Sequence, residues 1–70
     1  MAKIVKVIEL LAQSDKSWED AAQAAVTQAS KTIRHIRSIY IKEHEAVVEN
    51  GRITQYRINA KISFEWEGAD

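Results

Sequence analysis

The dipeptide Asn50-Gly51 lies between two runs rich in β-branched and aromatic residues, and it limits the possible folds more than any other feature of this chain. Both residues readily adopt the positive φ angles of a two-residue type I′ turn, which connects antiparallel strands. From Tyr56 to Trp66, apolar and polar side chains then alternate. This period of two is typical of a strand with one buried face. We therefore predict a long β-hairpin.

The two-residue turn also predicts which residues of the hairpin lie opposite one another. The expected pairs are Glu49 with Arg52, Val48 with Ile53, His44 with Arg57, Lys42 with Asn59, Tyr40 with Lys61 and Ser38 with Ser63. In this register Ile39 and Ile41 share the apolar face of the final strand, whereas Tyr40 and His44 lie on the polar face with Lys42. The alternation slips phase near Gln55, where a bulge would shift the pairing.

A further strand and a helix are expected before the hairpin. Residues 3–12 are evenly apolar and rich in β-branched types, a pattern typical of a strand covered on both faces. Ser17 and Asp20 have the spacing of a helix cap, which predicts a helix that begins near Trp18. Apolar residues then recur in steps of three and four on one helical face, namely Trp18, Ala22, Ala25, Val26, Ala29, Ile33 and Ile36. Cations follow in the expected last turns of the helix, namely Lys31, Arg34, His35 and Arg37.

The element order strand, helix, strand, strand predicts an α+β fold in which one helix packs on one face of a three-stranded antiparallel sheet. The helical stripe consists mainly of alanine, so it contributes little apolar area to the core. A chain of 70 residues without cysteine has no disulfide to compensate, and domains of this size bury only about 60% of the surface of the unfolded chain. One sheet face and the strand edges stay uncovered in a monomer. We therefore expect self-association.

Charge and motif content exclude several classes of function. Ten Lys and Arg balance ten Asp and Glu, which argues against nucleic acid or an anionic membrane as a partner. No run approaches the roughly 18 apolar residues of a membrane span, and Lys6 and Glu9 interrupt the apolar stretch that a signal peptide requires. We expect a cytoplasmic protein. The sequence has neither a glycine-rich phosphate loop nor a nucleophile with a base at a diagnostic spacing, so we expect no enzyme activity.

Three segments, in this order and spacing, resemble the dodecin family. They are Val5-Lys-Val-Ile-Glu9 in the first strand, Ser17-Trp-Glu-Asp-Ala-Ala22 at the helix start, and Tyr56-Arg-Ile-Asn-Ala-Lys-Ile-Ser-Phe64 in the last strand. Dodecins are small β-α-β-β proteins that assemble into hollow homododecamers and typically hold flavins. The resemblance covers nearly the whole chain. It implies one dodecin-like domain over residues 1–70, with other copies of the same chain as its partners.

The resemblance also implies a ligand pocket with altered chemistry. In flavin-binding dodecins, a Trp early in the second strand stacks on the isoalloxazine ring, and a Gln on the third strand hydrogen-bonds to that ring. The matching positions here are Ser38 and Arg57, which our register places on the same uncovered face as Tyr40. Some relatives hold a phosphate-bearing ligand with Arg at the positions of Glu45 and Glu65. Because a hydroxymethyl group does not stack and carboxylates repel phosphate, we expect weak flavin binding or none.

We accordingly predict a non-catalytic homododecamer that sequesters or stores a small ligand, or forms a structural shell. One alternative is a dodecin that stores or buffers riboflavin or FMN, with Tyr40 or Arg57 compensating for the missing Trp. Another is a divalent-cation-binding variant, because Glu43 and Glu45 share a strand face and symmetry would gather their copies. A monomeric or dimeric partner-binding module is a third. Trp18 and Trp66 are expected to pack within the protein or at a subunit interface and not to contact a ligand.

Overall fold

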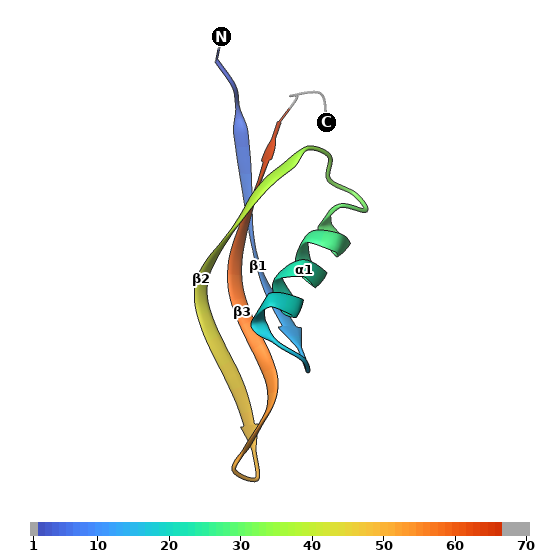
Figure 1. Ribbon diagram of the computed structural model, residues 1–70. Helices are drawn as coiled ribbons and strands as arrows, with labels where there is room; N and C mark the ends of the chain where they lie inside the picture. Colours follow the sequence, from blue (N-terminus) through green and yellow to red (C-terminus); the bar gives the residue numbers. More distant parts are fainter. Residues whose placement is uncertain (1, 67–70) are drawn as a thin grey trace.

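The computed structural model describes residues 2–66, which form three strands and one helix. The elements are β1 (Val5–Ser14), α1 (Trp18–Ala29), β2 (Ile36–Glu49) and β3 (Arg52–Glu65). The strands form one antiparallel sheet in the order β1-β3-β2, and α1 lies on one face of it (Figure 1). The predicted α+β fold, with one helix packed on a three-stranded antiparallel sheet, is confirmed.

The β2–β3 hairpin turns at Asn50 and Gly51, whose φ angles are 54° and 75°. Both angles are positive, as the predicted type I′ turn requires. The pairs predicted next to the turn and at the far end of the hairpin are confirmed, namely Glu49 with Arg52, Val48 with Ile53, Tyr40 with Lys61 and Ser38 with Ser63.

The hairpin has three register shifts, one of which lies at its far end between Ile36 and Ser38. The other two each add one residue and together shift the middle of the hairpin by one position. Thr54 is the extra residue on β3, next to the phase slip predicted near Gln55. Lys42 is the extra residue on β2, and it restores the original register toward the far end of the hairpin. Each is a β-bulge, in which two residues of one strand oppose a single residue of the other.

The shift changes which face of the sheet His44 occupies. His44 lies opposite Ile58, a fully buried residue beneath α1, and Glu45 lies opposite Arg57. The predicted pairs of His44 with Arg57 and of Lys42 with Asn59 are therefore wrong. The straight count from the turn failed because it did not include the two bulged residues.

The helix begins as predicted, because the Ser17 hydroxyl accepts a hydrogen bond of 2.9 Å from the backbone N–H of Asp20. It ends earlier than predicted, at Ala29. The apolar stripe predicted to reach Ile36 breaks off there, because the following residues form turns, and β-branched residues at 32, 33 and 36 disfavour a continued helix. The cations expected in the last helical turns instead lie in the loop and in β2, namely Lys31, Arg34, His35 and Arg37.

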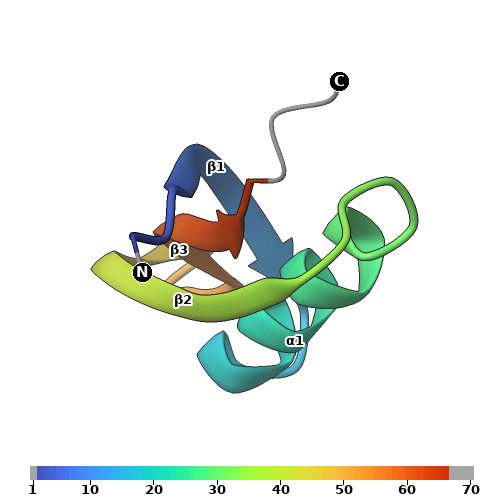
Figure 2. The ribbon, with the colours of Figure 1, turned by 90° about the horizontal axis from the view of Figure 1, so that it is seen from above.

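The core is thin and the molecule is elongated. The buried apolar residues among those described are Ala21, Ala25, Ile58, Ala60 and Ile62. The radius of gyration is 14.3 Å, whereas a compact domain of this length has about 11 Å. The sheet curves around one side of α1 (Figure 2), and the hairpin extends beyond the helix to give extents of 53 × 21 × 16 Å. The predicted alanine-lined core is thus present and leaves much of the sheet without a cover.

Only one face of β1 is covered within the chain, which corrects the expectation that both faces are. Ile8 and Leu10 lie on the α1 side, whereas Val7 and Leu11 on the other face are 54% and 69% exposed. The evenly apolar sequence of β1 therefore supplies two apolar faces. One packs toward α1, and the other has no intrachain partner among residues 2–66. No helix within these residues has the length and apolar character needed to cross a membrane.

Candidate functional site

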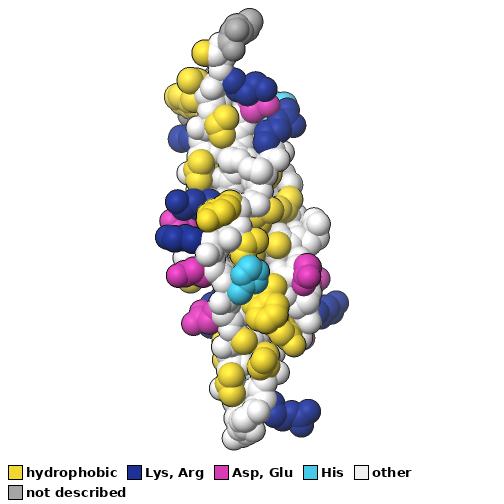
Figure 3. Space-filling model, turned by 60° about the vertical axis from the view of Figure 1, so that its left-hand side comes forward, with side chains coloured by type: hydrophobic (Ala, Val, Ile, Leu, Met, Phe, Trp, Pro, Cys, Tyr) yellow, Lys and Arg dark blue, Asp and Glu magenta, His cyan; other side chains and the backbone are white. Residues whose placement is uncertain are grey.

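The sheet face opposite α1, called the open face below, carries the residues that the sequence singled out. Strand alternation and the observed pairing assign side chains to it, because Ile58, Ala60 and Ile62 of β3 point toward α1. The open face comprises Val5, Val7, Glu9, Leu11 and Gln13 from β1, Arg57, Asn59, Lys61, Ser63 and Glu65 from β3, and Ser38, Tyr40, Glu43 and Glu45 from β2. The prediction that Ser38, Tyr40 and Arg57 share a face is confirmed. Apolar side chains stay on the molecular surface between charged ones (Figure 3).

Ser38 and Ser63 lie opposite each other on the open face, and their hydroxyl groups form a hydrogen bond. Val7 of β1 is the next residue across the sheet, opposite Ser63. The nearby aromatic side chain is Tyr40, which is 64% exposed. The position expected to carry a stacking aromatic ring is therefore a small polar pair beside an aliphatic side chain. It provides no ring for a flavin to stack on.

Arg57 links all three strands in the middle of the open face. Its Nε donates a hydrogen bond of 2.9 Å to Oε1 of Gln13 on β1. Its Nη1 donates to Oε1 of Glu45 on β2 at 3.4 Å. Partly exposed ion pairs of this kind contribute about 0.2–1 kcal/mol. The guanidinium is thus held in place and its charge is paired, which sequence reasoning missed because Gln13 becomes a neighbour only through the β1-β3-β2 strand order.

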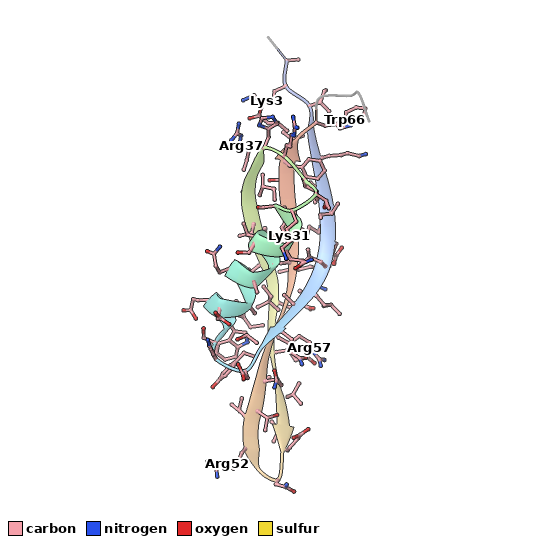
Figure 4. The ribbon with its side chains drawn as sticks, turned by 90° about the vertical axis from the view of Figure 1, so that its right-hand side faces the viewer. Lys3, Lys31, Arg37, Arg52, Arg57 and Trp66 are labelled. Carbon is pink, nitrogen blue, oxygen red and sulfur yellow. The ribbon has the colours of Figure 1, made fainter. Side chains whose placement is uncertain are left out.

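Glu65 lies at the other end of the sheet. Its Oε2 accepts a hydrogen bond of 2.7 Å from Nε of Arg37 and lies 3.3 Å from Nζ of Lys3. The Arg37 hydrogen bond, followed by the one from Lys3, holds the pKa of Glu65 below its ordinary value. Figure 4 shows Lys3 and Arg37 together at this end and Arg57 in the middle of the sheet.

One chain does not bring the five predicted pocket residues together. At about 3.3 Å per residue, Ser63, the partner of Ser38, lies roughly 20 Å along β3 from Arg57. Of the predicted set, Arg57 and Glu45 are in contact, whereas Glu65 is paired with Arg37 and Lys3. Any compact pocket formed from this set therefore requires residues of a second chain.

An acidic hollow of about 370 Å³ lies beside Glu45, the ion-pair partner of Arg57. It is lined by Leu11, Glu43, His44, Glu45 and Asn59. The Asn59 Oδ1 atom is buried and has no hydrogen-bond partner among the described residues, although a buried carbonyl oxygen normally has one. No group of three His, Cys, Asp or Glu side chains within residues 2–66 is arranged to hold a metal ion.

Trp18 is partly buried and packs against the core, as predicted, and it also contacts the backbone behind the candidate site. Its indole lies edge-on to the rings of Tyr56 and His44, with centroid distances of 4.9 and 5.7 Å. Its Nε1 donates a hydrogen bond of 2.9 Å to the backbone oxygen of Glu45. Trp66 is 37% exposed and lies under Nζ of Lys6 at 5.2 Å from the ring centroid.

Comparison with known proteins gives consistent matches over nearly the whole chain. The family model Dodecin matches residues 4–67. The dodecin of Thermus thermophilus is 31% identical over 67 residues, which cover 96% of this chain and 97% of that protein. The calcium dodecin of Mycobacterium tuberculosis is 37% identical over 67 residues, covering 94% of this chain and 93% of that protein. A crystal structure of a T. thermophilus dodecin mutant has a TM-score of 0.89 at 30% identity, covering 94% of this chain and 98% of that one.

Proposed function

The chain belongs to the dodecin family, and we propose that it is a non-catalytic homododecamer that sequesters or stores a small ligand or forms a structural shell. Its pocket departs from the flavin-binding pattern of the family and binds flavin weakly or not at all. The absence of cysteine is consistent with the cytoplasmic location that this proposal includes.

The observation that carries the proposal is the uncovered open face of an elongated chain. Val5, Val7, Leu11 and Tyr40 are each at least half exposed on that face. Clusters of apolar side chains on a protein surface commonly mark contacts with a partner. The small core and the excess radius of gyration support copies of the same chain as the missing cover. Twelve copies is the number expected from the family.

The altered pocket is supported by the side chains at the two flavin-contact positions. Ser38 is hydrogen-bonded to Ser63 and offers no aromatic ring. Arg57 replaces the glutamine of flavin-binding relatives, and two of its five N–H donors are engaged by Gln13 and Glu45. The carboxylates of Glu45 and Glu65 stand where some relatives hold phosphate with arginine. The site therefore disfavours phosphorylated ligands most strongly.

Fluorescence titration of riboflavin and of FMN with purified protein tests this proposal. We expect little quenching of riboflavin and less of FMN, and a colourless preparation. Strong quenching of either flavin would overturn the altered pocket and support the alternative of a flavin-storing dodecin, in which Tyr40 or Arg57 compensates for the missing Trp. Free riboflavin mixed with an unrelated protein of equal mass concentration is the matched control.

A second candidate function is divalent-cation binding. It is supported by the 37% identity to a calcium dodecin and by the acidic hollow, in which Glu43, Glu45 and the unpartnered Asn59 Oδ1 atom come together. Calcium prefers six to eight oxygen ligands, so copies of these residues from neighbouring subunits would have to complete the shell. Calorimetric titration of chelator-treated protein with calcium tests this function, with Glu43→Gln as the disabled variant and Glu49→Gln as its control. Absence of both heat and thermal stabilisation would exclude it.

A further inference from the structure

The two β-bulges decide which β2 side chain lies opposite Arg57. A straight count from the Asn50-Gly51 turn places His44 there, whereas the extra residue Thr54 places Glu45 there. Lys42 then returns the strands to the unshifted register. The segment between the bulges, residues 43–47, is therefore offset by one position, while the pairs beside the turn and those from Ser38 to Ile41 keep the register of the turn. A slip of one residue in such a segment turns every side chain to the opposite face.

Trp18 contacts both strands of this offset segment. The indole Nε1 donates to the backbone oxygen of Glu45 at 2.9 Å, and the edge of the ring contacts His44. On the partner strand the same ring contacts Tyr56. Trp18 is the first residue of α1, which Ser17 caps and whose Ala21 is fully buried against the sheet. An anchored helix end thus contacts both strands of the offset segment from behind.

We propose that Trp18 is a positioning residue that fixes the charge of the candidate site by holding the register in which Glu45, and not His44, lies against Arg57. In the slipped register the carboxylate of Glu45 turns toward the α1 side and the imidazole of His44 takes its place. The guanidinium of Arg57 then loses its paired anion. Trp18 therefore keeps a carboxylate on the open face that repels anionic ligands, although Trp18 itself lies on the other side of the sheet. This inference rests on the proposed function, because the site at Arg57 is part of the proposed pocket.

The experiment is disulfide trapping, for which this cysteine-free chain gives no background. One variant carries Glu45→Cys with Arg57→Cys, and the other carries His44→Cys with Arg57→Cys. Directly opposed residues on one face of an antiparallel pair have Cβ atoms about 4.5–5.5 Å apart, close enough to cross-link, whereas residues on opposite faces are not. Both variants retain the backbone oxygen that accepts from Trp18. Each is oxidised with and without Trp18→Phe, which keeps an aromatic ring but removes the N–H donor.

The trapped pairs are identified by peptide mass spectrometry of folded protein isolated by size exclusion. With Trp18 present, we expect the 45–57 disulfide and little of the 44–57 disulfide. Loss of one hydrogen bond predicts that Trp18→Phe raises the ratio of 44–57 to 45–57 trapping roughly 2- to 13-fold. Trp66→Phe is the matched control and should leave the ratio unchanged. The inference is overturned if Trp18→Phe leaves this ratio unchanged, or if Trp66→Phe changes the ratio as much as Trp18→Phe does. Because no ligand takes part, a failure of the proposed binding function would leave this result unaffected.

Discussion

Arg57 and Glu45 contact each other across the β2–β3 pair, with 3.4 Å between the guanidinium Nη1 and the carboxylate Oε1. Gln13 holds the same guanidinium from the β1 side through its Oε1, at 2.9 Å from Nε. The middle of the open face thus contains a cation that is paired with a carboxylate, and that carboxylate faces any ligand bound there. This pair accounts for the expected preference against phosphate groups.

The first prediction concerns the preference of the site against phosphate groups. Glu45→Gln removes the acid but keeps a side chain of the same shape, so we expect FMN to bind better relative to riboflavin. An exposed charge of this kind alters binding by about 0.2–1 kcal/mol, or roughly 1.4- to 5-fold. Fluorescence titration at low ionic strength measures both affinities. Glu49→Gln, on the same strand beside the turn, is the control, and a ratio that stays unchanged in Glu45→Gln contradicts the account.

The second prediction concerns the missing aromatic ring. Ser38→Trp restores a stacking surface at the position that carries a Trp in flavin-binding dodecins. Aromatic pairs contribute about 0.5–1.5 kcal/mol beyond the burial of area, which corresponds to roughly a 2- to 13-fold gain in riboflavin affinity. Flavin fluorescence quenching measures the gain. Ser38→Ala removes the hydrogen bond to Ser63 without adding a ring, and an equal gain in that variant would show that stacking is not the cause.

The third prediction concerns the pH dependence of stability. Arg37 and Lys3 lower the pKa of Glu65 from its ordinary value of 4.5. A carboxyl group whose pKa is lowered in the folded state stabilises that state above its unfolded pKa, and the stabilisation is lost as the pH falls through the folded pKa. The Tm difference between the native protein and Glu65→Gln should therefore be greatest above about pH 4.5 and vanish in more acidic solution.

Thermal unfolding between pH 7 and pH 3 measures this difference. Sodium chloride at 1 M reduces the Debye length to about 3 Å and should also diminish it, because the Lys3 side chain is largely exposed. A Tm difference that is the same at every pH would show that Glu65 acts through packing and not through its charge.

Local features of the fold were predictable from the sequence, and features that depend on strand order were not. The turn at Asn50-Gly51 and the cap at Ser17 follow from backbone preferences of single residues. The bulge at Thr54 left a phase slip in the apolar alternation, whereas the compensating bulge at Lys42 lies among polar residues and left none. The helix was predicted too long because Ile33 and Ile36 continue its spacing by coincidence.

Within the candidate site, too, local features were predictable and contacts that depend on the order of the strands were not. Ser38 and Arg57 could be assigned to one face, because alternation and the turn fix their positions on β2 and β3. The contact of Arg57 with Gln13 requires β1 to lie beside β3, and the bond from Trp18 to Glu45 requires α1 to cross the offset segment. Neither arrangement is encoded in a local pattern.

We expect other copies of this chain to cover the sheet face that a single copy leaves open. Native mass spectrometry of freshly purified protein tests it most directly, since it reports the number of subunits and any retained ligand together. We expect one dominant species of about 96 kDa, twelve times the 8.0 kDa chain, without retained flavin. A monomer or dimer as the dominant species would contradict it and favour a partner-binding module.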